Sequence, residues 1–164
     1  FWGFRNSNCL IEKNIIKFSF CRNEVNMKRR FLIATHSTLA EGFANALKFF
    51  AGDDIDVTYI NAYVDGKPID EEIDSYFSTL KDEDELVILT DLLAGSVNQK
   101  LYKYISREHT HILTGTNLAL ALSLVLESAD GYLTNECING LVNASKDNIV
   151  YMNEFQAEVD DDDE

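Results

Sequence analysis

The sequence is poor in the residues that cross-link chains or bind anionic surfaces. It has three cysteines in 164 residues and no C-x-x-C pair, so it indicates neither a disulfide framework nor a thiolate zinc site. No apolar run approaches the roughly 18 residues that can span a bilayer. The formal net charge of −14 would repel a nucleic-acid backbone or an anionic membrane. We therefore expect a cytoplasmic protein that binds neither directly.

Several site signatures are also missing. The sequence contains no Walker A loop, no G-x-G-x-x-G fingerprint and no HExxH motif. His109 and His111 are two residues apart and would share one face of a strand, but no third ligand accompanies them. We interpret them as a surface pair, and we expect no metal and no cofactor.

The remaining composition favours one domain of alternating strands and helices, because 46% hydrophobic residues in a chain of this length can fill one core. The expected strands are Phe31–Ala34, Ile55–Ile60, Leu86–Thr90 and Thr110–Thr114. Helical apolar stripes cover Leu39–Phe50, Ile69–Leu80, Ser96–Ile105, Leu118–Leu126 and Leu133–Ser145. A charged connection, Lys81–Glu85, precedes the third strand. This alternation predicts a doubly wound α/β domain, with a parallel sheet and helices on both faces.

The two ends of the chain differ in composition from this domain. Residues 1–26 carry four Lys/Arg, two Asp/Glu and no recognisable strand–turn–helix order. They also lack the features of a secretory signal. We expect Met27 to be the natural start and residues 1–26 to be a non-native or disordered leader, with an amphipathic extension as the alternative. Residues 154–164 include the acidic run Asp160–Glu164, which is too charged to pack, and we expect a disordered tail there.

The stretch FLIATHSTLAEG, residues 31–42, places a single histidine at a junction between strand and helix. His36 follows an apolar block and precedes a helix start, which is where open α/β sheets bind ligands and backbone N–H groups favour anions. A second junction, DLLAGSVNQ from Asp91, supplies a carboxylate and a glycine loop. Asn117 lies at a third junction of this kind. His36 is therefore a candidate functional residue, with a loop histidine that only bonds nearby backbone as the alternative.

The two polar junctions meet if their strands are neighbours, as a switch point between crossovers requires. A carboxylate of Asp91 that accepts Nδ1–H from His36 would leave the Nε2 lone pair free. Such an imidazole is a base or a nucleophile, and hydroxyls and a glycine loop beside it favour attack on phosphorus. The expected phosphate-binding residues are Ser37, Thr38, Gly95 and Ser96. Ser96 also suits the plainer role of a helix N-cap.

Three segments then carry a family resemblance: FLIATHSTLAEGFANAL, LVILTDLLAGSVNQ and ILTGTNLALAL. In order and spacing they resemble the signature segments of the mannose-family EIIA domain of the bacterial phosphotransferase system, over about residues 29–150. We expect the phosphocarrier domain itself to span residues 27–153. The resemblance implies a phosphocarrier in which His36 accepts a phosphoryl group on Nε2 from phospho-HPr and passes it to a sugar-specific EIIB. Asp91 matches the aspartate that orients and stabilises this histidine. Thr35, Asn98 and Asn117 are expected at the rim of the site.

The resemblance also implies an architecture and an assembly. The family fold is a four-stranded parallel sheet with an antiparallel edge strand, which some members exchange within a homodimer. Asn148–Met152 is the candidate for that strand. Contact with the membrane is expected only through the EIIC and EIID transporter subunits. Ser37 and Ala94 stand where the family commonly has glycine, a substitution that costs stability if either position needs a positive φ.

Two other functions stay open at this point. One is the phosphocarrier subunit of phosphoenolpyruvate-dependent dihydroxyacetone kinase, which shares the fold and the histidine. That subunit typically carries a Met-Asp-Met-Gly-Ser type of motif, whereas Thr90–Ser96 looks more like the sugar transporter's version. The other is a non-catalytic regulatory module that binds a partner through the same face.

Overall fold

The computed structural model describes residues 27–155, so the predicted leader 1–26 and residues 156–164 of the predicted tail lie outside the described residues. Within the described chain, four parallel strands form one sheet in the order β2-β1-β3-β4, accompanied by five helices. The strands are β1 Arg29–His36, β2 Val57–Ala62, β3 Glu85–Thr90 and β4 Thr110–Thr114. The helices are α1 Leu39–Ala51, α2 Ile69–Phe77, α3 Ser96–Tyr102, α4 Leu118–Leu126 and α5 Asn135–Lys146.

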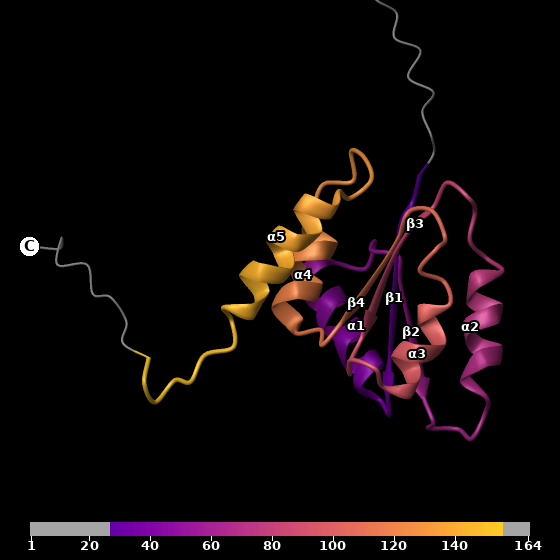
Figure 1. Cartoon of the computed structure of the whole chain (residues 1–164), viewed down its shortest axis with the longest axis horizontal. Helices are drawn as coiled ribbons and strands as arrows, with labels where there is room; N and C mark the ends of the chain where they lie inside the picture. The colour runs from indigo at the N-terminus through magenta and orange to yellow at the C-terminus, as the bar shows by residue number, and fades with distance from the viewer. Residues whose placement is uncertain (1–26, 156–164) are drawn as a thin grey trace, which may run out of the picture.

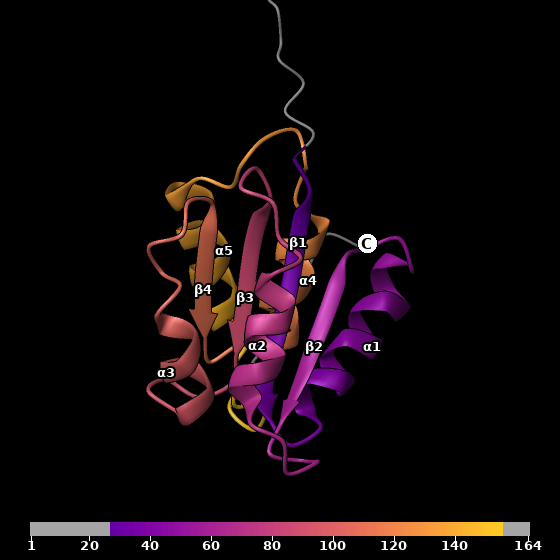
Figure 2. The same ribbon diagram turned by 90° about the vertical axis from the view of Figure 1, so that its right-hand side faces the viewer.

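The helices lie on both faces of the sheet, which confirms the predicted doubly wound α/β fold. Helices α2 and α3 lie in front of the sheet in Figure 2, with α1, α4 and α5 behind it. Helix α5 packs against α4 on that side (Figure 1), and its apolar residues join the same core cluster as β1, β3 and β4. The arrowheads of all four strands point to the same end of the sheet, so the loops that follow them gather there (Figure 2).

The central strands are apolar throughout because each is buried on both faces. Along β1, Phe31 and Ile33 pack toward α1 and α4, whereas Leu32 and Ala34 pack toward α2 and α3. All six residues of β3 are buried. Each fully buried Leu, Ile or Val contributes about 1.5–3 kcal/mol relative to an exposed one. Because β1 and β3 pair in parallel within this core, their carboxyl ends lie beside each other.

The last predicted element is absent from the described chain. Residues 148–152 form turns and extended chain after α5, with no strand pairing. The segment leads away from the end of α5 (Figure 1), so it does not reach a sheet edge of its own chain. Ile149, Tyr151 and Met152 are exposed. The expected edge strand is therefore not formed within a single chain, and its exchange between subunits stays a prediction.

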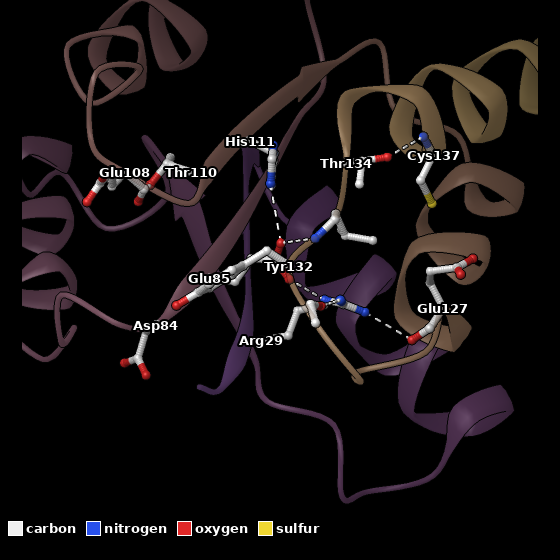
Figure 3. A network of polar contacts seen from close by, with 12 residues as sticks. Arg29, Asp84, Glu85, Glu108, Thr110, His111, Glu127, Tyr132, Thr134 and Cys137 are labelled. Atoms are coloured by element: carbon white, nitrogen blue, oxygen red, sulfur yellow. Dashed lines mark hydrogen bonds and ion pairs between the residues drawn. The ribbon is translucent and has the colours of Figure 1, made fainter. Parts of the chain in front are cut away.

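A buried polar cluster closes the amino end of the sheet (Figure 3). The side chain of Glu85 is fully buried, and its carboxylate pairs with Arg29, lies 3.4 Å from Nε2 of His111 and accepts the backbone N–H of Leu133. Arg29 also donates to three carbonyls in the connection between α4 and α5, those of Glu127, Ser128 and Gly131. The cluster thus holds this connection against the sheet.

The two neighbouring histidines do not form the expected surface pair. His109 precedes β4, has a φ of 53° and stacks on Tyr132 with 3.5 Å between ring centroids. His111 lies within β4, and its side chain is only 17% exposed because it turns toward Glu85. The prediction was wrong because it assumed that both residues belonged to one regular strand.

Candidate functional site

The structure brings His36 and Asp91 together at the carboxyl ends of the adjacent strands β1 and β3. Asp91 Oδ2 accepts two hydrogen bonds from His36, one from the backbone N–H at 2.9 Å and one from Nδ1 at 2.8 Å. Asp91 Oδ1 accepts the backbone N–H of Leu92 at 2.8 Å. Both carboxylate oxygens are therefore occupied by donors, and the imidazole is fixed in rotation.

The carboxylate of Asp91 remains ionised at neutral pH. Partial burial raises the pKa of this group, but the hydrogen bonds from His36 and Leu92 outweigh that effect and hold the pKa below its ordinary value. An ionised carboxylate only accepts hydrogen bonds, so Nδ1 of His36 carries the proton. The lone pair of the neutral ring is then on Nε2.

Nε2 of His36 faces a chain of two hydroxyls. Ser96, the first residue of α3, has Oγ 3.1 Å from Nε2. The phenolic hydroxyl of Tyr63 donates to the same Oγ at 2.8 Å, and its ring lies 5.7 Å from the imidazole, centroid to centroid. The side chain of His36 is 35% exposed, so a reactant can approach Nε2 from solvent.

Tyr63 was missed by the sequence analysis. It follows the last residue of β2, which pairs with the end of β1, since His36 lies opposite Ala62 in the register. The predicted strand ended at Ile60, so the signal was only a polar aromatic residue in the loop shortly after it. It could have been used by asking which side chains all strand ends contribute, rather than only those of the first and third strands.

Three backbone positions around the site have a left-handed conformation. Ser37, Tyr63 and Ala94 have φ values of 56°, 67° and 57°, and they are three of the four non-glycine residues with positive φ in the described chain. Such a conformation costs an L-residue about 1–2 kcal/mol. The two positions where the family commonly has glycine, Ser37 and Ala94, do require a positive φ, and strain of this kind is typical of functional sites.

The loop from Asp91 to Ser96 is held by its own hydrogen bonds. The N–H of Gly95 donates to the carbonyl of Leu92 at 3.0 Å, so it already has a partner within the loop. The side chain of Asn98 accepts from the N–H of Ala94 and donates to Thr90 Oγ1, so it links the loop to the last residue of β3. A Cβ on Gly95 would lie 3.1 Å from the Leu92 carbonyl and 3.4 Å from Cε1 of His36. Position 95 therefore suits glycine.

The other predicted residues divide into two groups. Ser37 and Thr38 are exposed in the loop between β1 and α1. Asn61 accepts the first-turn N–H of Glu41, and the other N–H groups of that turn favour an anion. Thr35 is buried, and its hydroxyl bonds weakly to the carbonyl of His36. Asn117 caps α4 through the N–H of Leu120 and donates to a carbonyl of α5. The last two therefore have structural contacts that do not involve the imidazole.

An apolar rim borders the site. Leu92 and Leu93 in the loop after β3 are 60% and 79% exposed, although large apolar side chains are usually buried. Leu39, at the start of α1, is also exposed. A reactive group rimmed by exposed leucines suits a protein partner better than a small molecule enclosed in a cavity.

Comparison with known proteins agrees with this geometry. A sequence model of the PTS system fructose IIA component, the EIIA-man family, matches residues 30–142. No curated protein matched the chain. Among solved structures, a Klebsiella pneumoniae protein provisionally described as a phosphoenolpyruvate-dependent sugar phosphotransferase system permease is 31% identical. The similarity covers 78% of this chain and 93% of that one, with a TM-score of 0.72.

Two further structures resemble the chain. The PTS IIA protein associated with the fucose utilization operon of Streptococcus pneumoniae is 25% identical, with 77% of this chain and 95% of that one covered and a TM-score of 0.63. The mannose/sorbose specific IIA subunit from Enterococcus faecalis is 14% identical, with 82% and 100% covered and a TM-score of 0.64, a likeness of fold alone. In the described part of this chain, no helix has the length and apolar character to cross a membrane. The chain belongs to the EIIA family of phosphotransferase-system components, of the fructose and mannose type.

Proposed function

We propose that the chain is a cytoplasmic phosphocarrier in which His36 accepts a phosphoryl group on Nε2 from phospho-HPr and passes it to a sugar-specific EIIB. The observation that carries the proposal is the double hydrogen bond from His36 to Asp91 Oδ2. It leaves one nitrogen as the nucleophile and points that nitrogen toward solvent. Family membership supports a phosphotransfer role in general, and the hydrogen bonds of the imidazole support His36 as the acceptor.

The transfer step follows from the charges around the ring. The Nε2 lone pair forms the new N–P bond in line with the N–P bond of the donor, whose electron pair returns to the donor nitrogen. Nε2 loses no proton, because none was bound there. The phosphorylated ring keeps its proton on Nδ1 and becomes cationic, and this charge faces the Asp91 carboxylate at 2.8 Å. Asp91 therefore stabilises the product and the transition state more than the neutral ring.

The phosphoryl oxygens need hydrogen-bond donors. Ser96 Oγ is next to Nε2, and Ser37 and Thr38 supply hydroxyls beside the start of α1. The backbone N–H of Gly95 could join them only by leaving the carbonyl of Leu92. We assign phosphate binding chiefly to Ser96 and the α1 start, with Gly95 required mainly for space beside His36.

We further propose that the family's exchanged strand forms here from residues 148–152. Ile149, Tyr151 and Met152 are exposed, which is unfavourable in an isolated chain and is relieved if they pair with the sheet of a second copy. Separately, we propose that the protein contacts the membrane only through the EIIC and EIID subunits.

A phosphorylation assay tests the central proposal. The purified protein is incubated with phosphoenolpyruvate, enzyme I and HPr, and its intact mass is measured with HPr present and absent. We expect an acid-labile addition of one phosphoryl group that depends on HPr and maps to His36, and none in His36→Ala. Unlabelled wild-type protein, with enzyme I and HPr active on another EIIA, would favour a regulatory binding module. Onward transfer to a dihydroxyacetone kinase instead of EIIB would place the chain in that system.

A further inference from the structure

The aromatic residue after β2 carries an inference about the same site. We propose that Tyr63 is a positioning residue for phosphoryl transfer, which acts through Ser96 to direct the Ser96 hydroxyl hydrogen at Nε2 of His36 and then at the transferred phosphoryl group. This inference rests on the proposed function. It concerns a residue that makes no bond to the imidazole itself.

The direction of the hydrogen bonds is fixed from one end. Asp91 only accepts, so Nδ1 of His36 donates and Nε2 must accept. The partner of Nε2 is Ser96 Oγ at 3.1 Å, which therefore donates its single hydrogen. Ser96 Oγ can then only accept from Tyr63 at 2.8 Å. The chain runs from Tyr63 to Ser96 to His36, with one donor and one acceptor at each step.

Without Tyr63, the Ser96 hydroxyl would be held only by its 3.1 Å bond to Nε2 of His36 and could turn its hydrogen to solvent more easily. The bond from Tyr63 occupies one lone pair and leaves the hydrogen pointing to the imidazole side. After transfer, Nε2 has no lone pair to accept this hydrogen. The Ser96 hydroxyl then donates to a phosphoryl oxygen, which lies on the same side, and Tyr63 keeps its bond to Ser96.

The backbone of Tyr63 supports a role beyond general packing. Its φ of 67° is rare for a bulky residue, yet the side chain is exposed and gains little burial in return. Its ring is tilted by 33° against the imidazole, which brings the hydroxyl over the start of α3. The strained conformation is thus the one that delivers the hydroxyl to Ser96.

The test is a double-mutant cycle on the phosphorylation rate. Tyr63→Phe removes the hydroxyl and keeps the ring, and we expect transfer from phospho-HPr to slow about threefold to tenfold, the range of one neutral hydrogen bond. The KM for phospho-HPr should not change, because the docking surface is intact. Ser96→Ala should slow transfer further. Adding Tyr63→Phe to Ser96→Ala should change nothing more, since Tyr63 acts only through Ser96.

A matched control and a spectroscopic readout separate positioning from packing. Tyr59 is an exposed tyrosine on β2, the strand that Tyr63 follows, and Tyr59→Phe should transfer at the wild-type rate. In protein labelled with nitrogen-15, Tyr63→Phe should shift the Nε2 resonance of His36 and leave Nδ1 protonated, whereas Tyr59→Phe should shift neither.

Each outcome decides between the two proposals. Labelling of Tyr63→Phe at the wild-type rate, or an effect that multiplies with that of Ser96→Ala, overturns the role of Tyr63 and leaves the phosphocarrier standing. A raised KM with an unchanged rate at saturation would make Tyr63 a docking residue. Wild-type protein that takes no phosphoryl group from active phospho-HPr overturns the phosphocarrier and the role of Tyr63 together.

Discussion

A histidine faces a carboxylate at each end of this sheet, and the two pairs differ in what else the carboxylate binds. At the carboxyl end, His36 and Asp91 are 2.8 Å apart with side chains 35% and 12% exposed, and no cation shares that carboxylate among the described residues. At the amino end, His111 and Glu85 are 3.4 Å apart and 17% and 0% exposed, and Glu85 is already neutralised by Arg29. The first pair can respond to a charge that arrives on the ring. The second pair is buried and already neutralised, so we call the amino end of the sheet the closed end and the carboxyl end the reactive end.

This contrast explains why similar residues give a reactive site in one place and a structural cluster in the other. The charge of Asp91 is available to a phosphorylated imidazole because its other partners are neutral N–H groups. The charge of Glu85 is shared between Arg29 and the N–H of Leu133, which ties β1 and β3 to the connection before α5 (Figure 3). Mutations at the two ends should therefore affect different quantities.

The largest effect is expected at the amino end. Glu85→Gln keeps the shape of the side chain but leaves the Arg29 guanidinium, whose side chain is 5% exposed, without its counter-charge. Removing one partner of a buried ion pair typically costs about 3–5 kcal/mol of unfolding free energy. Urea denaturation of Glu85→Gln and wild type measures this loss. The phosphorylation rate of the folded fraction should stay near that of wild type, and a loss of rate without a loss of stability would contradict the division between the two ends.

The converse change is Asp91→Asn. Whichever way the amide turns, its NH₂ group faces an N–H donor, either from His36 or from Leu92. Loss of the charge also removes the stabilisation of the cationic phosphorylated ring. We expect phosphoryl transfer to fall about 10- to 100-fold, the range found when a group that orients a metal-binding histidine is removed. The loss of unfolding free energy should be about 1–3 kcal/mol, smaller than that of Glu85→Gln. Wild-type labelling kinetics in this variant would remove Asp91 from the mechanism.

The sequence predicted much of the reactive end and little of the closed end, for physical reasons. Apolar runs identify β1 and β3 as central strands, and parallel pairing then places His36 beside Asp91. Glu85 was interpreted as part of a charged connection because ionisable residues are usually exposed. Its burial depends on Arg29, far away in the chain, which pattern reasoning cannot pair with it. Tyr63 was missed because it lies beyond the predicted end of the second strand, and the left-handed φ that turns it toward Ser96 leaves no mark in the sequence.

Acid should lower the unfolding free energy through the carboxylates at both ends of the sheet, Glu85 and Asp91. Burial raises the pKa of Glu85, but bonds from His111, Arg29 and Leu133 outweigh it and lower the pKa from 4.5, and the pKa of Asp91 is likewise lowered from 3.8. A depressed folded-state pKa stabilises the protein above the unfolded value, and this stability is lost as pH falls through the folded value. Unfolding free energy should therefore decline below about pH 4.5.

Thermal unfolding from pH 7 to pH 3 checks this dependence, with Glu85→Gln as the comparison. The variant cannot lose what the glutamate contributes, so its curve should be flatter over the acid range. Parallel curves for the variant and wild type would show that Glu85 is not responsible for the acid sensitivity. In Asp91→Asn the curve should flatten only at the lower end, since the ordinary pKa of aspartate is lower.

The smallest effect concerns backbone strain at the reactive end. Ala94 has a φ of 57°, so Ala94→Gly removes a clash worth about 1–2 kcal/mol, partly offset by the entropy that glycine adds to the unfolded chain. We expect a net gain of about 0.5–1 kcal/mol in urea denaturation. Ala46→Gly, within α1, is the control and should lose about 1 kcal/mol, because a helical residue gains nothing from left-handed freedom. Equal losses in the two variants would show that the loop is not strained. A gain in Ala94→Gly alone would show that the loop beside His36 carries backbone strain at this position.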